Sequence, residues 1–198
     1  MVTEKRDPAT GRIVVEGGDE ADYIQVHDYD SDEDGVADGI TVESYDEQGN
    51  QTFGQNYTAA EAKRMSIKGG GGDDVIEVDG DVQYGLNLEG GKGNDQILGG
   101  AGNDRILGGE GNDRLYGSGG DDRMFGSGGD DLMYGGTGND EMWGGEGNDR
   151  MAGQAGDDEM YGGLGNDSMR GGLGNDGLYG QEGKDDVEDH LGTNEVNQ

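Results

Sequence analysis

The sequence predicts an all-β fold, a parallel β-solenoid of short strands in two sheets with Gly/Asp turns, and three observations support this prediction. Residues 90–188 are one nine-residue unit repeated eleven times without a gap. Every copy has Gly at its first and fourth positions and Asp at its sixth. The eighth position is always apolar: Ile97, Ile106, Leu115, Met124, Met133, Met142, Met151, Met160, Met169, Leu178 and Val187. A unit this short cannot bury its apolar side chain alone, so it must stack on copies of itself.

Each unit is predicted to contain one turn and one strand. Six of its residues are rich in Gly, Asn and Asp, which supply positive φ angles and side chains that bond the local backbone, and these favour a turn. The other three residues, positions seven to nine, fit a short strand whose middle side chain points away from its neighbours. Because each unit reverses the chain, two consecutive units make one coil. The position-eight side chains then fill the space between two parallel sheets.

The repeat resembles that of a known family. Copies such as GGKGNDQIL from Gly90, GGAGNDRIL from Gly99 and GGEGNDRLY from Gly108 fit the pattern GGxGxDxUx, where U is apolar. This pattern is similar to the nonapeptide of the RTX (repeats-in-toxin) calcium-binding β-roll. The resemblance covers half of the chain and implies a parallel β-roll whose Gly/Asp turns bind Ca²⁺.

Turns that are two units apart are expected to lie directly over one another, which places Asp95 over Asp113 and Asp104 over Asp122. A hard divalent cation between each pair removes the repulsion between such carboxylates. The predicted carboxylate ligands are Asp74, Asp95, Asp104, Asp113, Asp122, Asp131, Asp140, Asp149, Asp158, Asp167, Asp176 and Asp185. The resemblance implies further ligands from backbone carbonyls, including those of Gly102, Gly111, Gly120, Gly129, Gly138, Gly147, Gly156, Gly165 and Gly174. Eleven copies make nine stacked pairs, hence about nine or more calcium ions.

The composition agrees with this prediction. The formal net charge is −32 over 198 residues, and 29% of the residues are hydrophobic. So much like charge opposes a compact state and places the metal-free chain near the disordered class. We therefore expect calcium binding and folding to be one event.

Residues 1–89 are expected to form irregular capping coils at the N-terminal end of the same solenoid. A worn copy of the repeat begins at Gly17, and a good copy contains Asp74 and Ile76. Between them lies an insertion, about residues 27–64, with a strand-like run from Ile40, a turn from Asp46 and a short helical stretch at 58–64. Residues 1–11 are expected to be a frayed or docking terminus, and residues 189–198 a short polar tail.

The insertion contains a second candidate calcium site. Its acidic residues have the spacing of the first nine positions of an EF-hand loop: Asp30, Asp32, Asp34 and Asp38. Thr41 stands where such a loop has its bidentate Glu. The alternative, a merely acidic hairpin tip, therefore stays open.

Two columns of side chains need interpretation. Six consecutive methionines at position eight predict a packed core rather than a soft-metal site. Position nine faces outward, and its residues in the two sheets are Leu107, Phe125, Trp143, Tyr161 and Tyr179 in one, and Leu98, Tyr116, Tyr134, Ala152 and Arg170 in the other. Either the aromatic residues stabilise the sheet as cross-strand pairs, or they form a contact surface for a glycan, a cell wall or another copy.

Several classes of protein are disfavoured. The chain has no Cys for disulfides or thiolate metal sites, and no apolar run that is long enough to span a membrane. His27 and His190 belong to no HExxH motif, and no GxSxG motif occurs, so an enzyme is not expected. Thirteen Lys and Arg against 45 Asp and Glu argue against nucleic-acid binding.

Three functions without catalysis fit these observations. The first is a secreted calcium-binding β-roll that folds on Ca²⁺ and acts as an extracellular structural or adhesive element, with self-assembly as one option. The second is the calcium-folded export module of a larger toxin or hydrolase. The resemblance implies bacterial type I export, although the usual C-terminal signal is not evident. The third, an ice-binding roll, would need regular outward threonines, and Thr137 is the only threonine in the eleven copies.

Overall fold

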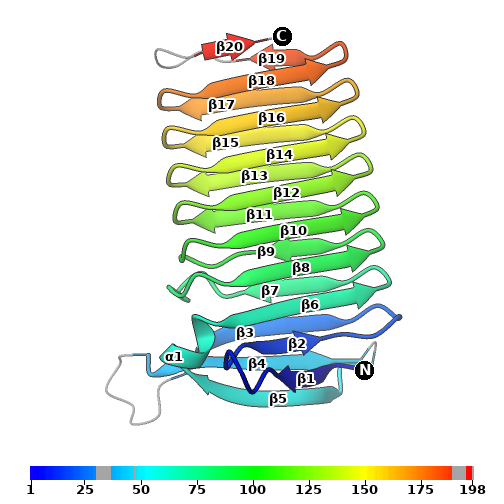
Figure 1. The fold of residues 1–198 in the computed structure, drawn as a ribbon, viewed down its shortest axis with the longest axis vertical. Coiled ribbons are helices and arrows are strands. Elements are labelled where there is room, and N and C mark those ends of the chain that lie inside the picture. Colours follow the sequence, from blue (N-terminus) through cyan, green and yellow to red (C-terminus); the bar gives the residue numbers. More distant parts are fainter. Residues whose placement is uncertain (30–36, 47, 189–194, 198) are drawn as a thin grey trace.

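The protein is described by a computed structural model that covers residues 1–29, 37–46, 48–188 and 195–197. Within these residues the strands form two ten-stranded sheets stacked into a rod, with the N-terminal strands at one end and β20 at the other (Figure 1). The first sheet contains, in spatial order, β1 (Thr3–Arg6), β2 (Ile13–Glu16), β6 (Met65–Gly71), β8 (Asn87–Lys92), β10 (Arg105–Glu110), β12 (Arg123–Gly128), β14 (Glu141–Glu146), β16 (Glu159–Leu164), β18 (Gly177–Glu182) and β20 (Glu195–Asn197). The second contains β19 (Asp186–Glu188), β17 (Ser168–Leu173), β15 (Arg150–Ala155), β13 (Leu132–Thr137), β11 (Arg114–Gly119), β9 (Gln96–Leu98), β7 (Val75–Val78), β3 (Tyr23–Tyr29), β4 (Gly39–Tyr45) and β5 (Gln51–Thr58). One short helix, α1 (Ala59–Ala62), follows β5.

The register confirms two repeats per coil. In the first sheet β10 pairs in parallel with β12, so that Ile106 lies beside Met124, the equivalent residue two repeats later. In the second sheet β11 pairs in parallel with β13, with Leu115 beside Met133. The predicted parallel β-solenoid is therefore confirmed.

The strands are longer than the sequence predicts. β10 takes in positions seven to nine of one copy and continues through positions one to three of the next. Its pairing with β12 skips one residue, because Leu107 pairs with Phe125 and the next pair is Gly109 with Ser127. A Cβ at the skipped Gly108 would overlap Oδ2 of Asp113, so this position in the strand needs a residue without a side chain. The turn itself is reduced to positions four to six.

The core lies between the two sheets and consists of the position-eight side chains. From Ile97 to Leu178 these side chains are at most 3% exposed, and Val187 is partly buried against them. The methionines thus pack inside, as predicted. In the described residues no helix is both long enough and apolar enough to cross a membrane.

The N-terminal end of the roll is closed by antiparallel strands. β1 lies antiparallel to β2, while β4 and β5 extend the second sheet antiparallel to β3. The strand-like run from Ile40 and the helical stretch after Thr58 are found as β4 and α1. The sequence did not predict β5 as a strand. These strands cover the first parallel coil, as expected of a terminal cap.

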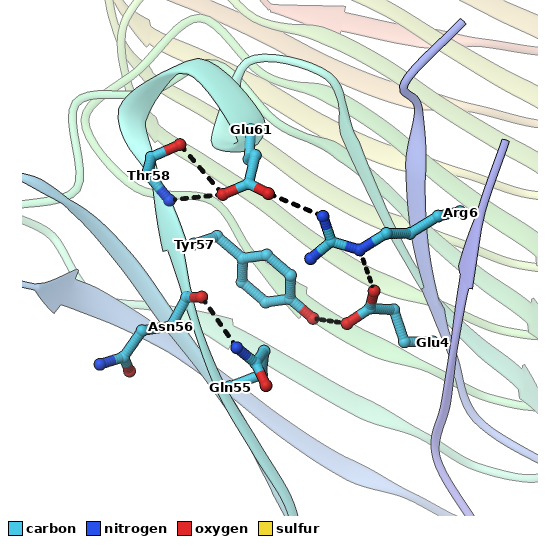
Figure 2. A network of polar contacts seen from close by, with 7 residues as sticks. All are labelled: Glu4, Arg6, Gln55, Asn56, Tyr57, Thr58 and Glu61. Carbon is cyan, nitrogen blue, oxygen red and sulfur yellow. Dashed lines mark hydrogen bonds and ion pairs between the residues drawn. The ribbon is translucent and has the colours of Figure 1, made fainter. Parts of the chain in front are cut away.

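A polar network joins the cap across its elements (Figure 2). The buried Tyr57 of β5 donates its hydroxyl hydrogen bond to Glu4 of β1 at 2.8 Å. Arg6 of β1 forms ion pairs with Glu4 and, at 2.7 Å, with Glu61 of α1. Glu61 also accepts hydrogen bonds from the backbone N–H and the hydroxyl of Thr58, both at 3.0 Å. The first residues of the chain therefore dock on the cap.

The first sheet continues beyond residue 188. β20 pairs in parallel with β18, with Glu195 beside Gly177 and Val196 beside Leu178. The offset is again that of two repeats. In sequence, residues 189–197 keep Gly192 at position four and Val196 at position eight, so the tail contains a degenerate twelfth copy.

Candidate metal centre

The position-six aspartates form two ladders, one along each edge of the roll. In each ladder the backbone N–H of one Asp donates to Oδ1 of the Asp one coil further on, at 2.7 Å from Asp95 to Asp113 and from Asp104 to Asp122. The first ladder comprises Asp22, Asp74, Asp95, Asp113, Asp131, Asp149, Asp167 and Asp185. The second comprises Asp104, Asp122, Asp140, Asp158 and Asp176. The structure thus brings all twelve predicted aspartates into two stacks.

The second carboxylate oxygen of most of these residues has no protein partner. Eleven of the predicted aspartates are at most 3% exposed, and Asp185 at the end of its ladder is less buried. In the described part of the chain, a buried Oδ2 without a hydrogen bond occurs in Asp74, Asp95, Asp113, Asp122, Asp131, Asp140, Asp149, Asp158 and Asp167. Asp104 differs because its Oδ2 accepts a hydrogen bond from the N–H of Gly100 at 3.1 Å. Burying a polar atom without a hydrogen-bond partner costs free energy. The recurrence of such oxygens along both ladders therefore points to a bound ligand.

The position-one glycines leave the space into which these oxygens point. A Cβ added at Gly144 would overlap Oδ2 of Asp149 and would lie 2.5 Å from the carbonyl oxygen of Gly162 on the next coil. The same arrangement recurs at Gly117, whose Cβ would overlap Oδ2 of Asp122 and lie 2.5 Å from the carbonyl oxygen of Gly135. A carboxylate oxygen and a carbonyl oxygen therefore converge on a cradle that any other residue would fill.

The position-four glycines allow the close stacking of the turns. Gly111 has φ +125°, and a Cβ there would overlap the carbonyl oxygen of Gly93 on the preceding coil. The same contact recurs between Gly129 and the Gly111 carbonyl. Position-four carbonyls, which the resemblance implies as ligands, thus lie between stacked turns.

Burial raises the pKa of the ladder aspartates from Asp74 to Asp167 above the ordinary value of 3.8. Desolvation is the main cause in every case, opposed by the backbone hydrogen bond to Oδ1 and, in most, reinforced by neighbouring carboxylates. It raises the pKa of Asp122 to about 8, of Asp131 and Asp158 to about 7, and of Asp140 to about 6. Such carboxyl groups carry their charge at neutral pH only at a cost, unless a cation lies beside them.

The available donor atoms fit calcium. They are all oxygens, from carboxylates and backbone carbonyls, which are the ligands that Ca²⁺ accepts in numbers of six to eight. Among the described residues, no cluster of three or more His, Cys, Asp or Glu side chains has metal-binding spacing. At a calcium site in this roll, two stacked aspartates would share the ion and the backbone would supply the remaining oxygens. A bound Ca²⁺ would supply positive charge that neutralises both carboxylates.

Sequence reasoning missed a second pair of ladders at position five. There the polarity is opposite, because the side-chain oxygen accepts from the backbone N–H of the following coil, as from Asn112 to Asn94 at 2.9 Å and from Asp130 to Asn112 at 2.8 Å. The signal was present, since ten of the eleven copies have Asn or Asp at this position. The exception, Lys184, ends its ladder, where its N–H donates to Asn166 at 3.0 Å.

The worn first copy also joins the aspartate ladder. The N–H of Asp22 donates to Oδ1 of Asp74 at 2.6 Å, so the stack begins one coil earlier than predicted. The offset from Asp22 to Asp74 spans the insertion. In the EF-hand-like loop, Asp30, Asp32 and Asp34 lie outside the described residues, and Asp38 lies just before β4.

The outward aromatic residues of the first sheet stack face to face. Ring centroids lie 4.6 Å apart for Phe125 and Trp143, 5.6 Å for Trp143 and Tyr161, and 4.9 Å for Tyr161 and Tyr179, with interplanar angles of 4° to 12°. The guanidinium of Arg105 lies 4.9 Å from the centroid of the Phe125 ring. Each inner ring therefore has both faces covered, and only ring edges point outward.

Comparison with known proteins identifies the repeat. The model of the RTX calcium-binding nonapeptide repeat matches residues 66–81, 87–115, 107–142, 116–151, 143–178 and 152–187, which together make up more than half of the chain. No curated protein and no solved structure matches the chain. The matched segments contain the whole of both aspartate ladders except Asp22. The chain therefore belongs to the RTX calcium-binding nonapeptide repeat family.

Proposed function

We propose that this protein is a secreted structural element that folds when Ca²⁺ binds between its stacked turns and that works where calcium is abundant, outside the cell. The family assignment supports a calcium-binding structural domain. The observation that carries the proposal further is the column of buried Oδ2 atoms without partners. Without a cation these atoms oppose the stacking of coils, and with one they hold it together.

Aspartate side chains and backbone carbonyls would each supply part of the calcium ligands. Two aspartates of one ladder, such as Asp131 and Asp149, would face one ion from adjacent coils. The position-one and position-four carbonyls of the same turns would contribute neutral oxygens. The backbone hydrogen bond to Oδ1, 2.8 Å for this pair, keeps each carboxylate turned so that Oδ2 enters the cradle. The nine pairs within the repeats would each take one ion, and Asp74 with Asp95 would add a tenth.

The test is calcium-dependent folding of the full chain. Far-UV circular dichroism of the demetallated protein should show little β-structure, and titration with Ca²⁺ should restore it, while calorimetry reports how many ions bind. Mg²⁺ at equal concentration is the control, because it demands a smaller octahedral site and releases its water reluctantly. Full β-structure in excess chelator, or no calcium uptake, would contradict the proposal.

The outward aromatic column is proposed to stabilise the sheet rather than to bind sugars by stacking. A sugar ring packs on the face of an aromatic ring, and the faces of Trp143 and Tyr161 are occupied by their neighbours. A second copy or a glycan would meet only ring edges here. Solution mass with calcium and with chelator tests for self-association.

The export module of a larger type I-secreted toxin or hydrolase is the alternative function, because RTX repeats are typical of such proteins. A catalytic domain in the same reading frame would favour this alternative over an independent structural protein.

A further inference from the structure

The outer face of the second sheet has a gap in its column of rings. Its position-nine residues lie in register on β11, β13, β15 and β17 as Tyr116, Tyr134, Ala152 and Arg170. Where the first sheet has a ring on every strand from β12 to β18, the second has a methyl group on β15. A hollow of about 270 Å³ lies there, and its lining includes Leu132, Tyr134, Arg150, Ala152, Ser168 and Arg170. We call it the Ala152 slot.

One wall of the Ala152 slot is the face of an aromatic ring. Tyr116 stacks on one side of Tyr134, with centroids 5.4 Å apart and planes 9° from parallel. The other side of Tyr134 borders the slot, because the next residue in register is Ala152. This differs from the first sheet, where Trp143 and Tyr161 are covered on both faces.

Arg170 lines the opposite side of the slot. Arg170 is the next residue in register after Ala152, and it forms an ion pair with Glu188 at 2.7 Å. Neighbouring strands lie about 4.8 Å apart. Tyr134 on β13 and Arg170 on β17 are two strands apart, so their positions in the sheet are separated by about 9.6 Å. That separation leaves room for one flat group stacked between the ring and the guanidinium, at the spacing at which the other rings of the roll stack.

The slot is less acidic than the chain as a whole. The chain carries 13 basic residues and a net charge of −32, whereas two arginines and a single acidic residue, Glu188, line the slot. Arg150 is exposed at the rim, on the strand that carries Ala152. An arginine both stacks on aromatic faces and binds carboxylates through two N–H groups, so this lining favours a ligand that offers both.

We propose that the Ala152 slot binds a planar aromatic ring that carries an anionic group such as a carboxylate. The ring stacks between Tyr134 and the guanidinium of Arg170, in the place where the column lacks a side chain. The anion lies on Arg150 at the rim. The slot needs only the folded roll, so this proposal does not depend on where or how many calcium ions bind.

The experiment uses the full chain in saturating Ca²⁺, checked for folding by circular dichroism, and 2-naphthoate as the probe. Fluorescence anisotropy and calorimetry should show one class of saturable site.

Ala152→Tyr fills the gap with the residue type that the column already uses, so it should fold and weaken binding by about tenfold or more. Arg150→Gln should weaken binding about fivefold. Arg114→Gln, in the same column as Arg150 but beside Tyr116, is the matched control and should leave binding unchanged.

Absence of saturable binding to the folded chain would overturn the proposal, as would unchanged binding by Ala152→Tyr. Equal loss of binding in Arg150→Gln and Arg114→Gln would also overturn it, because the effect would then be one of overall charge. Binding of glucuronate in place of 2-naphthoate would assign the slot to an acidic sugar and reject the aromatic ligand.

Discussion

The backbone N–H of Asp122 donates to Oδ1 of Asp140, one coil further on, at 2.9 Å, and the Oδ2 of Asp140 is left buried without a hydrogen bond. This relationship recurs along both edges of the roll. It gives most ladder carboxylates one oxygen that is hydrogen-bonded to the protein and one that is left without a protein partner. The consequences can be measured one position at a time.

Acid should partly replace calcium in the metal-free protein. Burial raises the pKa of Asp122 to about 8 and of Asp131 to about 7, from an ordinary value of 3.8, so the folded state binds protons more tightly than the unfolded chain. The stabilisation is fully present below the unfolded value and is lost as the pH rises through about 6 to 8. Circular dichroism of the demetallated chain should therefore show more β-structure at pH 4 than at pH 8.

Saturating calcium should reverse this dependence, because the ion binds the deprotonated carboxylates. A demetallated chain that is equally unfolded at both pH values would contradict the raised pKa values.

Removing one interior ladder charge should cost two calcium ions. Asp140 lies between Asp122 and Asp158 in its ladder, so Asp140→Asn should lower the stoichiometry by about two, whereas Asp185→Asn at a ladder end should lower it by about one. Calorimetry or native mass spectrometry gives the count. Asp130→Asn is the control, since position five already has Asn in the neighbouring Asn112 and Asn148. A loss of ions in that control would show that the sites extend to position five.

Filling one cradle should destabilise the roll locally. Gly144→Ala places a methyl group against Oδ2 of Asp149 and the carbonyl of Gly162, so it should lower the free energy of unfolding in calcium by about 1–3 kcal/mol. Urea unfolding measures it. Gly128→Ala is the matched control, because a Cβ at Gly128 meets nothing closer than 4.0 Å and its φ is not positive. If both variants unfold alike, the cradle has no special requirement for glycine.

The aromatic column should matter for stability rather than for contact. Trp143→Ala removes the ring between Phe125 and Tyr161, and it should lower the free energy of unfolding by about 1–3 kcal/mol through lost stacking and burial. Sedimentation in calcium should show the same mass for the variant and the original chain. Unchanged stability together with lost self-association or lost glycan binding would instead support the contact surface.

Much of the fold could be predicted because the sequence repeats with a fixed period of nine residues. Each unit has Asp at position six and an apolar residue at position eight, so every new coil meets the same surface on the coil before it. The first coil therefore determines how the later coils stack. Ile106 beside Met124 follows from that rule. The cap could not be predicted in the same way, because β1 and β5 have no repeat, and their positions depend on contacts such as Tyr57 with Glu4.

By itself the sequence determined the stacked roll, the inward methionines and the alignment of the aspartates, since these depend only on what recurs in every repeat. Only the tertiary structure decided which oxygen of most ladder aspartates is left without a protein partner, that position five runs its ladder in the opposite sense, and which ring of the outer columns keeps a bare face. Those outcomes depend on the neighbour one coil away in space. A hydrogen bond or a stacked ring covers one side of a group and leaves the other side open. The amino-acid sequence alone does not show which side is covered.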